Sequence, residues 1–324
     1  MTNFTLRVLR KFYVKLFGLP SDRSIDNSLC EYYDEDANNF IFDSISKSIE
    51  NNKGLSICKF GTTELATMIS QRLQGRYKLS DYRQFIHGYN IPLSYNKQIA
   101  DLNNLSGVFP ATVAVADDFV NLMFDCLGDV DILASYCHGE KYFLEELEKC
   151  RKVNLDGFYA PFLFNNPWTR ILKDKKVLVI HPFEESIKAQ YEQREFLFEN
   201  PDVLPMFKSL HVIKAVQSIA GQKCEYSNWF DALESMKKQM ETIDFDIALI
   251  GCGAYGFPLT VHAKRMGKIG IHLAGWTQML FGIYGKRWLV DQPKYAQFIN
   301  KHWIRPDKSE VPNNASTVEG GCYW

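Results

Sequence analysis

The stretch FDIALIGCGAYGFPL, residues 245–259, decides the fold class, because an unbroken apolar run passes through glycines into a helical pattern. Apolar runs of this kind are typical of strands buried on both faces of a parallel sheet. The turn has the spacing G-x-G-x-x-G at Gly251, Gly253 and Gly256, and Pro258 follows where a first helical turn tolerates proline. The stretch therefore predicts a strand, a close-approach turn and a helix.

The same alternation extends to both sides of this stretch. Apolar segments predict strands at 176–183 (KVLVIHPF), 210–216 (LHVIKAV), 245–251 (FDIALIG) and 268–275 (KIGIHLAG). Helical patterns lie between them at 184–198, 229–243 and 257–267, and two further strands are expected at 55–60 (LSICKF) and 130–136 (VDILASY). Strands alternating with helices predict an α/β, Rossmann-like fold with a mostly parallel sheet covered by helices on both faces.

Composition restricts the class of protein. A net charge of −1 over 324 residues provides no basic field, so nucleic acid is not expected as a partner. The eight cysteines show no C-x-x-C pair and no zinc-like spacing, which favours reduced thiols in a cytoplasmic protein. No signal peptide is recognisable, and no apolar run reaches the roughly 18 residues that a bilayer span needs.

The chain divides into an N-terminal amphipathic helix at 1–26, an α/β domain at 27–290 and a C-terminal tail at 291–324 that wraps onto it. In FTLRVLRKFYVKLFG (4–18), a helical wheel places the basic residues Arg7, Arg10, Lys11 and Lys15 on one arc and the apolar residues on the other. Such a helix binds peripherally to an anionic membrane, here through residues 4–17 at the inner face of the cell membrane, or docks on the protein body with its basic face in water.

The glycine motif at 251–256 is typical of a turn that approaches a pyrophosphate at a helix N-terminus. NAD is not expected as a cofactor, because no Asp or Glu that could hold the ribose occurs between Phe257 and Val290. The same window carries positive charge, which favours the diphosphate of a nucleotide-sugar; its basic residues are Lys264, Arg265, Lys268, Lys286, Arg287 and His272. The alternative is a tight β-α turn with surface lysines.

Other segments are expected at the same carboxyl edge of the sheet, where ligands of open α/β folds bind. His181 and Pro182 end one strand, and Gly275 opens a glycine-rich loop after another. The helix after His181 places Ser186, Gln190 and Arg194 at spacings of four residues, roughly on one face. Arg194 is interpreted either as a phosphate clamp or as a partner of Glu185 or Glu195 on a solvated face.

The stretch ICKFGTTEL, residues 57–65, predicts a second strand–turn–helix in the N-terminal part. Thr62 or Thr63 can cap the helix, and Glu64 stands on its first turn. A carboxylate there is favoured by the helix dipole, so one interpretation of Glu64 is a capping role alone.

KFGTTEL resembles the R/K-F-G-D-G-E-L turn of the GT-D-type bacterial glycosyltransferases. The segments VLVIHPFEESI, FDIALIGCGAYGFPL and IHLAGWTQMLFGIYGKRW resemble the same group, together over about residues 50–290, and WIRP…VEGGCYW resembles the tail of its capsule-locus members. The resemblance implies a sugar transferase in which an Asp-x-Glu pair holds Mn²⁺ or Mg²⁺. Glu64 matches the Glu, whereas Thr62 takes the place of the Asp and Ala160 stands where an acid precedes proline in that group. Since a hard cation prefers anionic oxygen ligands, the resemblance leaves the need for metal open.

The sequence thus predicts a glycosyltransferase that moves sugar from a nucleoside-diphosphate sugar, with UDP-sugar favoured, to a glycan or lipid-linked acceptor in cell-surface polysaccharide or glycolipid assembly. The alternative is a catalytically silent nucleotide-sugar-binding or assembly protein. The predicted catalytic residues are Glu64, which is also the candidate metal ligand, His181 and Arg194. The predicted nucleotide-sugar contacts are Phe60, Gly61, Thr62, Thr63, Pro182, Ser186, Gln190, Gln217, Gly251, Gly253, Gly256, Gly275, Lys286 and Arg287.

Overall fold

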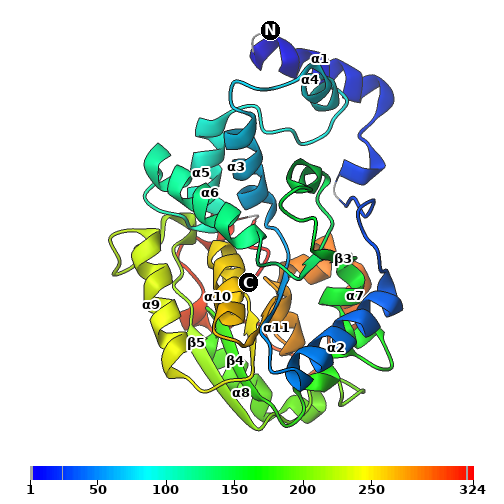
Figure 1. Ribbon diagram of the computed structural model, residues 1–324, viewed down its shortest axis with the longest axis vertical. Helices are drawn as coiled ribbons and strands as arrows, with labels where there is room; N and C mark the ends of the chain where they lie inside the picture. Colours follow the sequence, from blue (N-terminus) through cyan, green and yellow to red (C-terminus); the bar gives the residue numbers. More distant parts are fainter. Residues whose placement is uncertain (1–2, 24, 319) are drawn as a thin grey trace.

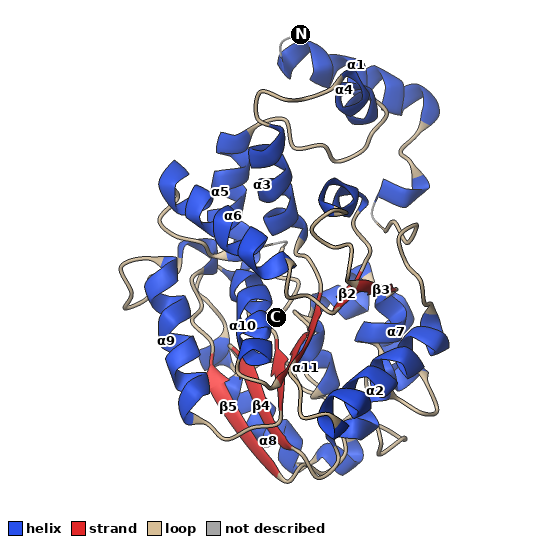
Figure 2. Ribbon diagram, in the orientation of Figure 1, coloured by secondary structure: helices blue, strands red, loops and turns tan. Residues whose placement is uncertain are grey.

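A computed structural model describes residues 3–23, 25–318 and 320–324, and it contains a seven-stranded sheet between two layers of helices (Figures 1 and 2). All strand pairs are parallel, in the order β3-β2-β1-β7-β6-β4-β5. The strands are β1 (Leu55–Cys58), β2 (Ile132–Ala134), β3 (Arg151–Val153), β4 (Lys176–His181), β5 (Ser209–Lys214), β6 (Ile247–Ile250) and β7 (Ile269–His272). The predicted α/β class with a parallel, Rossmann-like sheet is confirmed.

Helices occupy both faces of the sheet. The described α-helices are α1 (Asn3–Phe17), α2 (Asp34–Glu50), α3 (Thr62–Leu73), α4 (Leu79–Ile86), α5 (Tyr95–Ser106), α6 (Val113–Leu127), α7 (Leu155–Tyr159), α8 (Glu184–Glu192), α9 (Trp229–Thr242), α10 (Gly256–Arg265) and α11 (Trp276–Leu280). Helices α3, α6, α9 and α10 contribute to one apolar core, and α2, α7, α8 and α11 contribute to the core on the other face.

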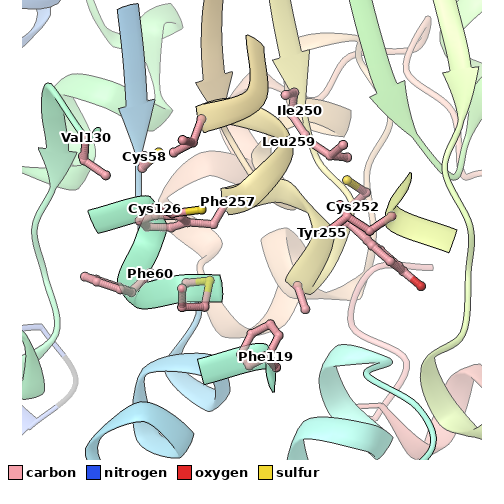
Figure 3. Packing of buried hydrophobic residues seen from close by; sticks show 14 of the residues in the cluster. Cys58, Phe60, Phe119, Cys126, Val130, Ile250, Cys252, Tyr255, Phe257 and Leu259 are labelled. Atoms are coloured by element: carbon pink, nitrogen blue, oxygen red, sulfur yellow. The ribbon is translucent and has the colours of Figure 1, made fainter. Parts of the chain in front are cut away.

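The alternation of side chains along β4 explains why both faces are buried. Leu178 and Ile180 point into the core formed with α9 and α10, while Val177 and Val179 point into the opposite core. Figure 3 shows part of the first core, in which Phe60 stacks on Phe257 with 5.2 Å between ring centroids. Five of the six predicted strands are found within their predicted ranges with shorter ends, whereas β5 spans 209–214 and not 210–216. β3 was not expected, because its three residues Arg-Lys-Val carry two charges and no strand pattern.

The topology brings several turns to one edge. Strand β1 lies between β2 and β7, and β4 lies between β6 and β5. The chain continues from β1 to β2, toward one edge of the sheet, and from β4 to β5, toward the other edge. In open α/β sheets, ligands bind at such switch points, outside the carboxyl ends of the strands. The segments that follow β1, β4, β6 and β7 meet there.

Helix α1 lies at the far end of the molecule from β4 and β5 and packs on α4 (Figure 1). Arg10 faces the protein body, where its guanidinium donates to the backbone carbonyl oxygens of Phe85, Gly88 and Tyr89 at 2.5–2.6 Å. Leu6 is fully buried, whereas large apolar side chains, among them Phe4 at 75% exposure, point away from the body. The helix therefore docks through Leu6 and Arg10, while most of its apolar side chains and the basic residues Arg7, Lys11 and Lys15 are exposed.

Among the residues that the structure describes, no helix combines the length and apolar composition that crossing a bilayer requires. The eight cysteines are all free thiols, as expected from their spacing.

The tail consists of short helical turns that lie against the body. Ile304 forms a parallel bridge with Ile283, and the indole N–H of Trp303 donates to the carbonyl of Leu197 at 2.9 Å. Near the end of the tail, the carbonyl of Tyr323 accepts a hydrogen bond from the side-chain amide of Gln278 at 3.1 Å. The tail thus reaches the carboxyl edge of the sheet.

Candidate functional site

A cavity of about 450 Å³ lies at the carboxyl edge of the sheet. Turns that follow β1, β4, β6 and β7 form its walls, and the tail contributes a further side. Of the predicted site residues, it gathers Gly61, Thr62, Thr63, Glu64, His181, Pro182, Gln217, Gly251, Gly253, Gly275 and Arg287. Residues that lie almost 230 positions apart in the chain therefore share one cavity.

Glu64 occupies the third position of α3 and is 8% exposed. Its carboxylate folds back over Gly61, where a Cβ atom would lie 1.8 Å from a carboxylate oxygen, so the glycine makes room for this conformation. The carboxylate makes no hydrogen bond or ion pair with any described residue. It lines the cavity, so capping of α3 does not account for its position. A buried carboxylate without a protein partner is costly unless a ligand, a cation or water pairs with it.

His181 ends β4 and is 3% exposed. Its Nδ1 accepts a hydrogen bond from the backbone N–H of Phe183 at 3.0 Å, which fixes the proton on Nε2. Burial lowers the pKa of His181 from 6.5 to about 3, so the ring stays neutral near neutral pH. His181 can therefore offer the cavity a hydrogen-bond donor, but not a positive charge.

Two cationic side chains line the cavity, Lys59 from the turn after β1 and Arg287 from the segment before the tail. The Arg287 guanidinium lies 4.4 Å from the centroid of the Tyr323 ring and donates to Cys322 Sγ at 3.3 Å. Its own backbone N–H donates to the carbonyl of Cys322 at 2.8 Å. The tail therefore positions the arginine that faces the cavity.

The three glycines of the G-x-G-x-x-G turn have different roles. Gly253 has φ +57°, a conformation that favours glycine, and a Cβ atom there would meet nothing closer than the carbonyl oxygen of Ser106 at 3.6 Å. At Gly251 a Cβ atom would overlap Thr277, and at Gly256 it would lie 2.2 Å from Nε2 of His272. Gly253 thus leaves backbone open to the cavity, while the other two serve close approach within the fold.

Gly275 also serves an internal contact, because a Cβ atom there would lie 2.5 Å from the Tyr323 ring. The glycine-rich loop predicted for ligand approach therefore admits the protein's own tail.

Five predicted site residues besides Gly256 lie outside this cavity. Phe60 is fully buried in the apolar core, where it stacks on Phe257 (Figure 3). Ser186 donates through its hydroxyl to the Glu310 carboxylate, and Gln190 donates to the carbonyl of Gly282 at 2.9 Å and to that of His302, in the tail, at 3.1 Å. Both residues therefore hold the tail.

Arg194 and Lys286 are the other two predicted site residues that lie outside the cavity. Arg194 pairs with Glu195 at 3.5 Å and lies 5.2 Å from the Tyr191 ring, which matches the alternative of a surface ion pair. Lys286 is exposed and does not line the cavity, although the next residue, Arg287, does.

The positive face expected after Phe257 is neutralised by acids from other segments. Lys264 pairs with Asp131 at 2.8 Å, and Arg265 pairs with Asp129 at 2.6 Å. Both basic residues lie in the last turn of α10, at the opposite end from the cavity. His272 contributes no charge, because burial, above all, lowers its pKa from 6.5 to about 3. Of the six basic residues between Phe257 and Val290, Arg287 is the one that brings a positive charge to the cavity lining among the described residues.

The donor set does not fit a divalent cation held by the protein alone. Glu64 and Asp291 each supply one carboxylate from separate segments, and Thr62 supplies a hydroxyl in place of a second acid at the turn that carries Glu64. Among the described residues, no three His, Cys, Asp or Glu side chains form a group that could hold a metal ion. Mg²⁺ and Mn²⁺ prefer sites built from several anionic oxygens held close together, which the described residues of this cavity do not provide.

Several residues of the cavity were not predicted. Lys59, Tyr136, Asp291, Tyr323 and Trp324 all line it. Lys59 directly precedes the FGTTEL turn, so its place at the end of the predicted strand would have predicted it as a site residue. Tyr136 follows β2, and the same reasoning about strand ends applies to it. Nothing in the sequence around Tyr323 and Trp324 predicts that they reach this edge of the sheet, apart from their apolar character.

Comparisons of the chain with protein-family models, curated protein sequences and solved structures found no match.

Proposed function

We propose that the protein is a glycosyltransferase that uses a nucleoside-diphosphate sugar, with a Rossmann-like fold of the GT-D type. One observation carries the proposal: Glu64, a buried carboxylate without a hydrogen bond or ion pair to any described residue, shares a cavity with two cations, Lys59 and Arg287, and one further carboxylate, Asp291. A transfer of this kind needs a base near the acceptor and positive charge near the leaving diphosphate. The resemblance of KFGTTEL to the GT-D turn supports the same assignment.

In this proposal, a hydroxyl oxygen of the acceptor bonds to the anomeric carbon of the donor sugar, and the bond from that carbon to the diphosphate breaks. Glu64 takes the proton of the acceptor hydroxyl. Arg287 and Lys59 stabilise the negative charge that stays on the nucleoside diphosphate. The Nε2–H of His181 and the open backbone at Gly253 add uncharged hydrogen-bond donors on the diphosphate side.

The second candidate is a nucleotide-sugar-binding protein without turnover. The single carboxylate beside Thr62 favours it, because the resemblance implies two acids at this turn. The two candidates share the binding of donor and differ in whether the sugar is released from it.

The test is incubation of the purified protein with UDP- and GDP-sugars, with and without Mn²⁺, followed by measurement of released nucleoside diphosphate. We expect release, whether by transfer or by slow hydrolysis, with at least one donor. Tight binding of nucleotide with no release under any condition would support the binding protein instead. NAD, added as a competitor, is expected to leave the thermal stability unchanged.

A further inference from the structure

A second cavity, of about 530 Å³, lies between α1 and α4 on one side and α3 and α5 on the other. Thr62 and Thr63 line both cavities, so the second one meets the first at the start of α3. Glu64 directly follows these two threonines. A molecule bound in the second cavity can therefore present a hydroxyl to the carboxylate that faces the first.

The charge of this second cavity is positive. It is lined by Arg7, Arg10, Arg23 and Lys97 together with one carboxylate, Asp101. Lys97 pairs with Asp101, and the Arg10 guanidinium is held by three backbone carbonyls. Arg23 donates to the side-chain oxygen of Asn90, which leaves its charge uncompensated. Arg7 has no ion pair or hydrogen bond with any described residue. Two arginines are thus available to bind an anion, and phosphate is the anion that guanidinium groups bind best.

Arg7 lines this cavity and lies on α1, which also carries an exposed apolar stripe formed by Phe4, Val8, Phe12 and Leu16. Phe4, Phe12 and Leu16 are 75%, 64% and 75% exposed, and Val8 lies between them at the same helical spacing. Lys11 and Lys15 are exposed beside the stripe, and α1 contains no acidic residue. An apolar face flanked by lysines and free of acids is complementary to an anionic lipid surface.

We infer that α1 lies on an anionic membrane and that the second cavity binds the phosphate of a lipid-linked acceptor presented from it. The acceptor role rests on the proposed function, whereas membrane and phosphate binding are measurable without any turnover. The apolar stripe enters the lipid, Arg7 and Arg23 hold the phosphate that joins the acceptor sugar to its lipid, and a sugar hydroxyl reaches past Thr62 and Thr63 toward Glu64.

The first experiment is flotation of the full chain with phosphatidylcholine vesicles, with and without phosphatidylglycerol. We expect binding to be roughly tenfold or more tighter with the anionic lipid, since each lysine or arginine near such a surface adds to the affinity. The double variant Phe4→Ser/Phe12→Ser should lose binding. Phe196→Ser is the matched control, because Phe196 is 58% exposed and belongs to another element, so its binding should equal that of the wild type.

The second experiment compares three soluble probes by calorimetry: dioctanoylphosphatidic acid, dioctanoylglycerol and inorganic phosphate. We expect the first to bind at least about tenfold tighter than the other two, and Arg7→Gln/Arg23→Gln to remove that preference. Equal binding of inorganic phosphate would assign the cavity to a free anion and overturn the inference. So would loss of vesicle binding in Phe196→Ser alone, or a stable dimer that the Phe4/Phe12 variant dissociates, which would identify the stripe as a contact between copies.

These outcomes separate the two proposals. If lipid probes and anionic vesicles bind but no donor sugar is ever released, the proposed function fails and the lipid-phosphate site stands. If donor is consumed but neither vesicles nor phosphatidic acid bind, the inference fails and the transferase stands.

Discussion

The carboxylate of Glu310 accepts hydrogen bonds from the hydroxyl and the backbone N–H of Ser186, at the first turn of α8. The backbone N–H of Glu185 donates to the same carboxylate at 2.8 Å. A helix N-terminus at the carboxyl edge of a parallel sheet is a common site for phosphate. Here a carboxylate from the tail occupies it, so the helix dipole of α8 serves to attach the tail.

Glu310→Gln is expected to destabilise the fold by about 1–3 kcal/mol, because Glu310 is 3% exposed and a glutamine amide would turn a donor toward N–H groups that need an acceptor. Urea unfolding measures the change. Glu195→Gln is the control, since that carboxylate is 74% exposed and its change should stay within about 0.5 kcal/mol. Equal effects of the two substitutions would show that the contact with α8 contributes nothing.

Gly256→Ala is expected to destabilise the protein by about 1–3 kcal/mol, because the new methyl group would lie 2.2 Å from Nε2 of the buried His272 ring. Gly128 has no neighbour within 4 Å and an ordinary helical φ of −64°, so Gly128→Ala should be neutral or stabilising by up to about 1 kcal/mol. Thermal unfolding of the two variants tests this. A stable Gly256→Ala protein with unchanged nucleotide affinity would refute the assigned role of this glycine.

The stability of the protein should depend on the protonation of two buried histidines. The pKa values of His181 and His272 are lowered from 6.5 to about 3, chiefly by burial, so the fold holds neutral rings that the unfolded chain would protonate. The contribution of the two neutral rings to the free energy of unfolding is complete above about pH 6.5. It is lost as the pH falls toward 3, by up to roughly 1.4 kcal/mol per pH unit for each ring.

Glu140 has the opposite dependence, because burial raises its pKa from 4.5 to about 7 and its stabilising effect is lost as the pH rises through that value. The measurement is therefore the difference in unfolding free energy between the wild type and His272→Gln over pH 3–6.5. The contribution of Glu140 cancels in this difference, because both proteins contain it. The variant should lose less stability than the wild type on acidification. Parallel curves would contradict a neutral, buried His272.

Thr62→Asp is expected to create a cation site, because it adds a second carboxylate to the turn that carries Glu64. Mn²⁺ should raise the thermal stability of this variant and leave that of the wild type unchanged. Thr63→Asp is the control for added charge at the same turn. Equal stabilisation of the wild type by Mn²⁺ would show that one carboxylate suffices and would reopen a metal-dependent reaction.

The sheet could be predicted because its strands are continuous apolar runs, as in KVLVIHPF and FDIALIG, separated by helical patterns. The order of the strands could not be predicted, since local patterns do not specify which strands pair. The contacts of α1 could not be predicted for a related reason: the helical wheel shows two arcs, but not that Arg10 donates to three carbonyl oxygens at the end of α4 and just after it.

The candidate site was predictable for residues at the carboxyl end of a strand or in the turn and first helical turn that follow it. Glu64, His181 and Gly253 are of this kind, and all three line the cavity. Ser186 and Gln190 lie on α8 as predicted, but α8 ends at Glu192, before Arg194. None of the three lines the cavity, and the tail covers Ser186 and Gln190 through Glu310 and His302. A contact between the tail and α8, about 125 residues apart, leaves no local mark in either segment.

The role of Glu64 as the base of a sugar transfer is tested by comparing donor turnover and donor binding in Glu64→Gln with those of the wild type. The glutamine has the same size but cannot accept the proton, so we expect turnover to fall by at least roughly a hundredfold, while calorimetry shows nucleotide affinity within about threefold of the wild type. Glu148→Gln, at an exposed position, should match the wild type in both. Turnover that survives in Glu64→Gln would rule out Glu64 as the base.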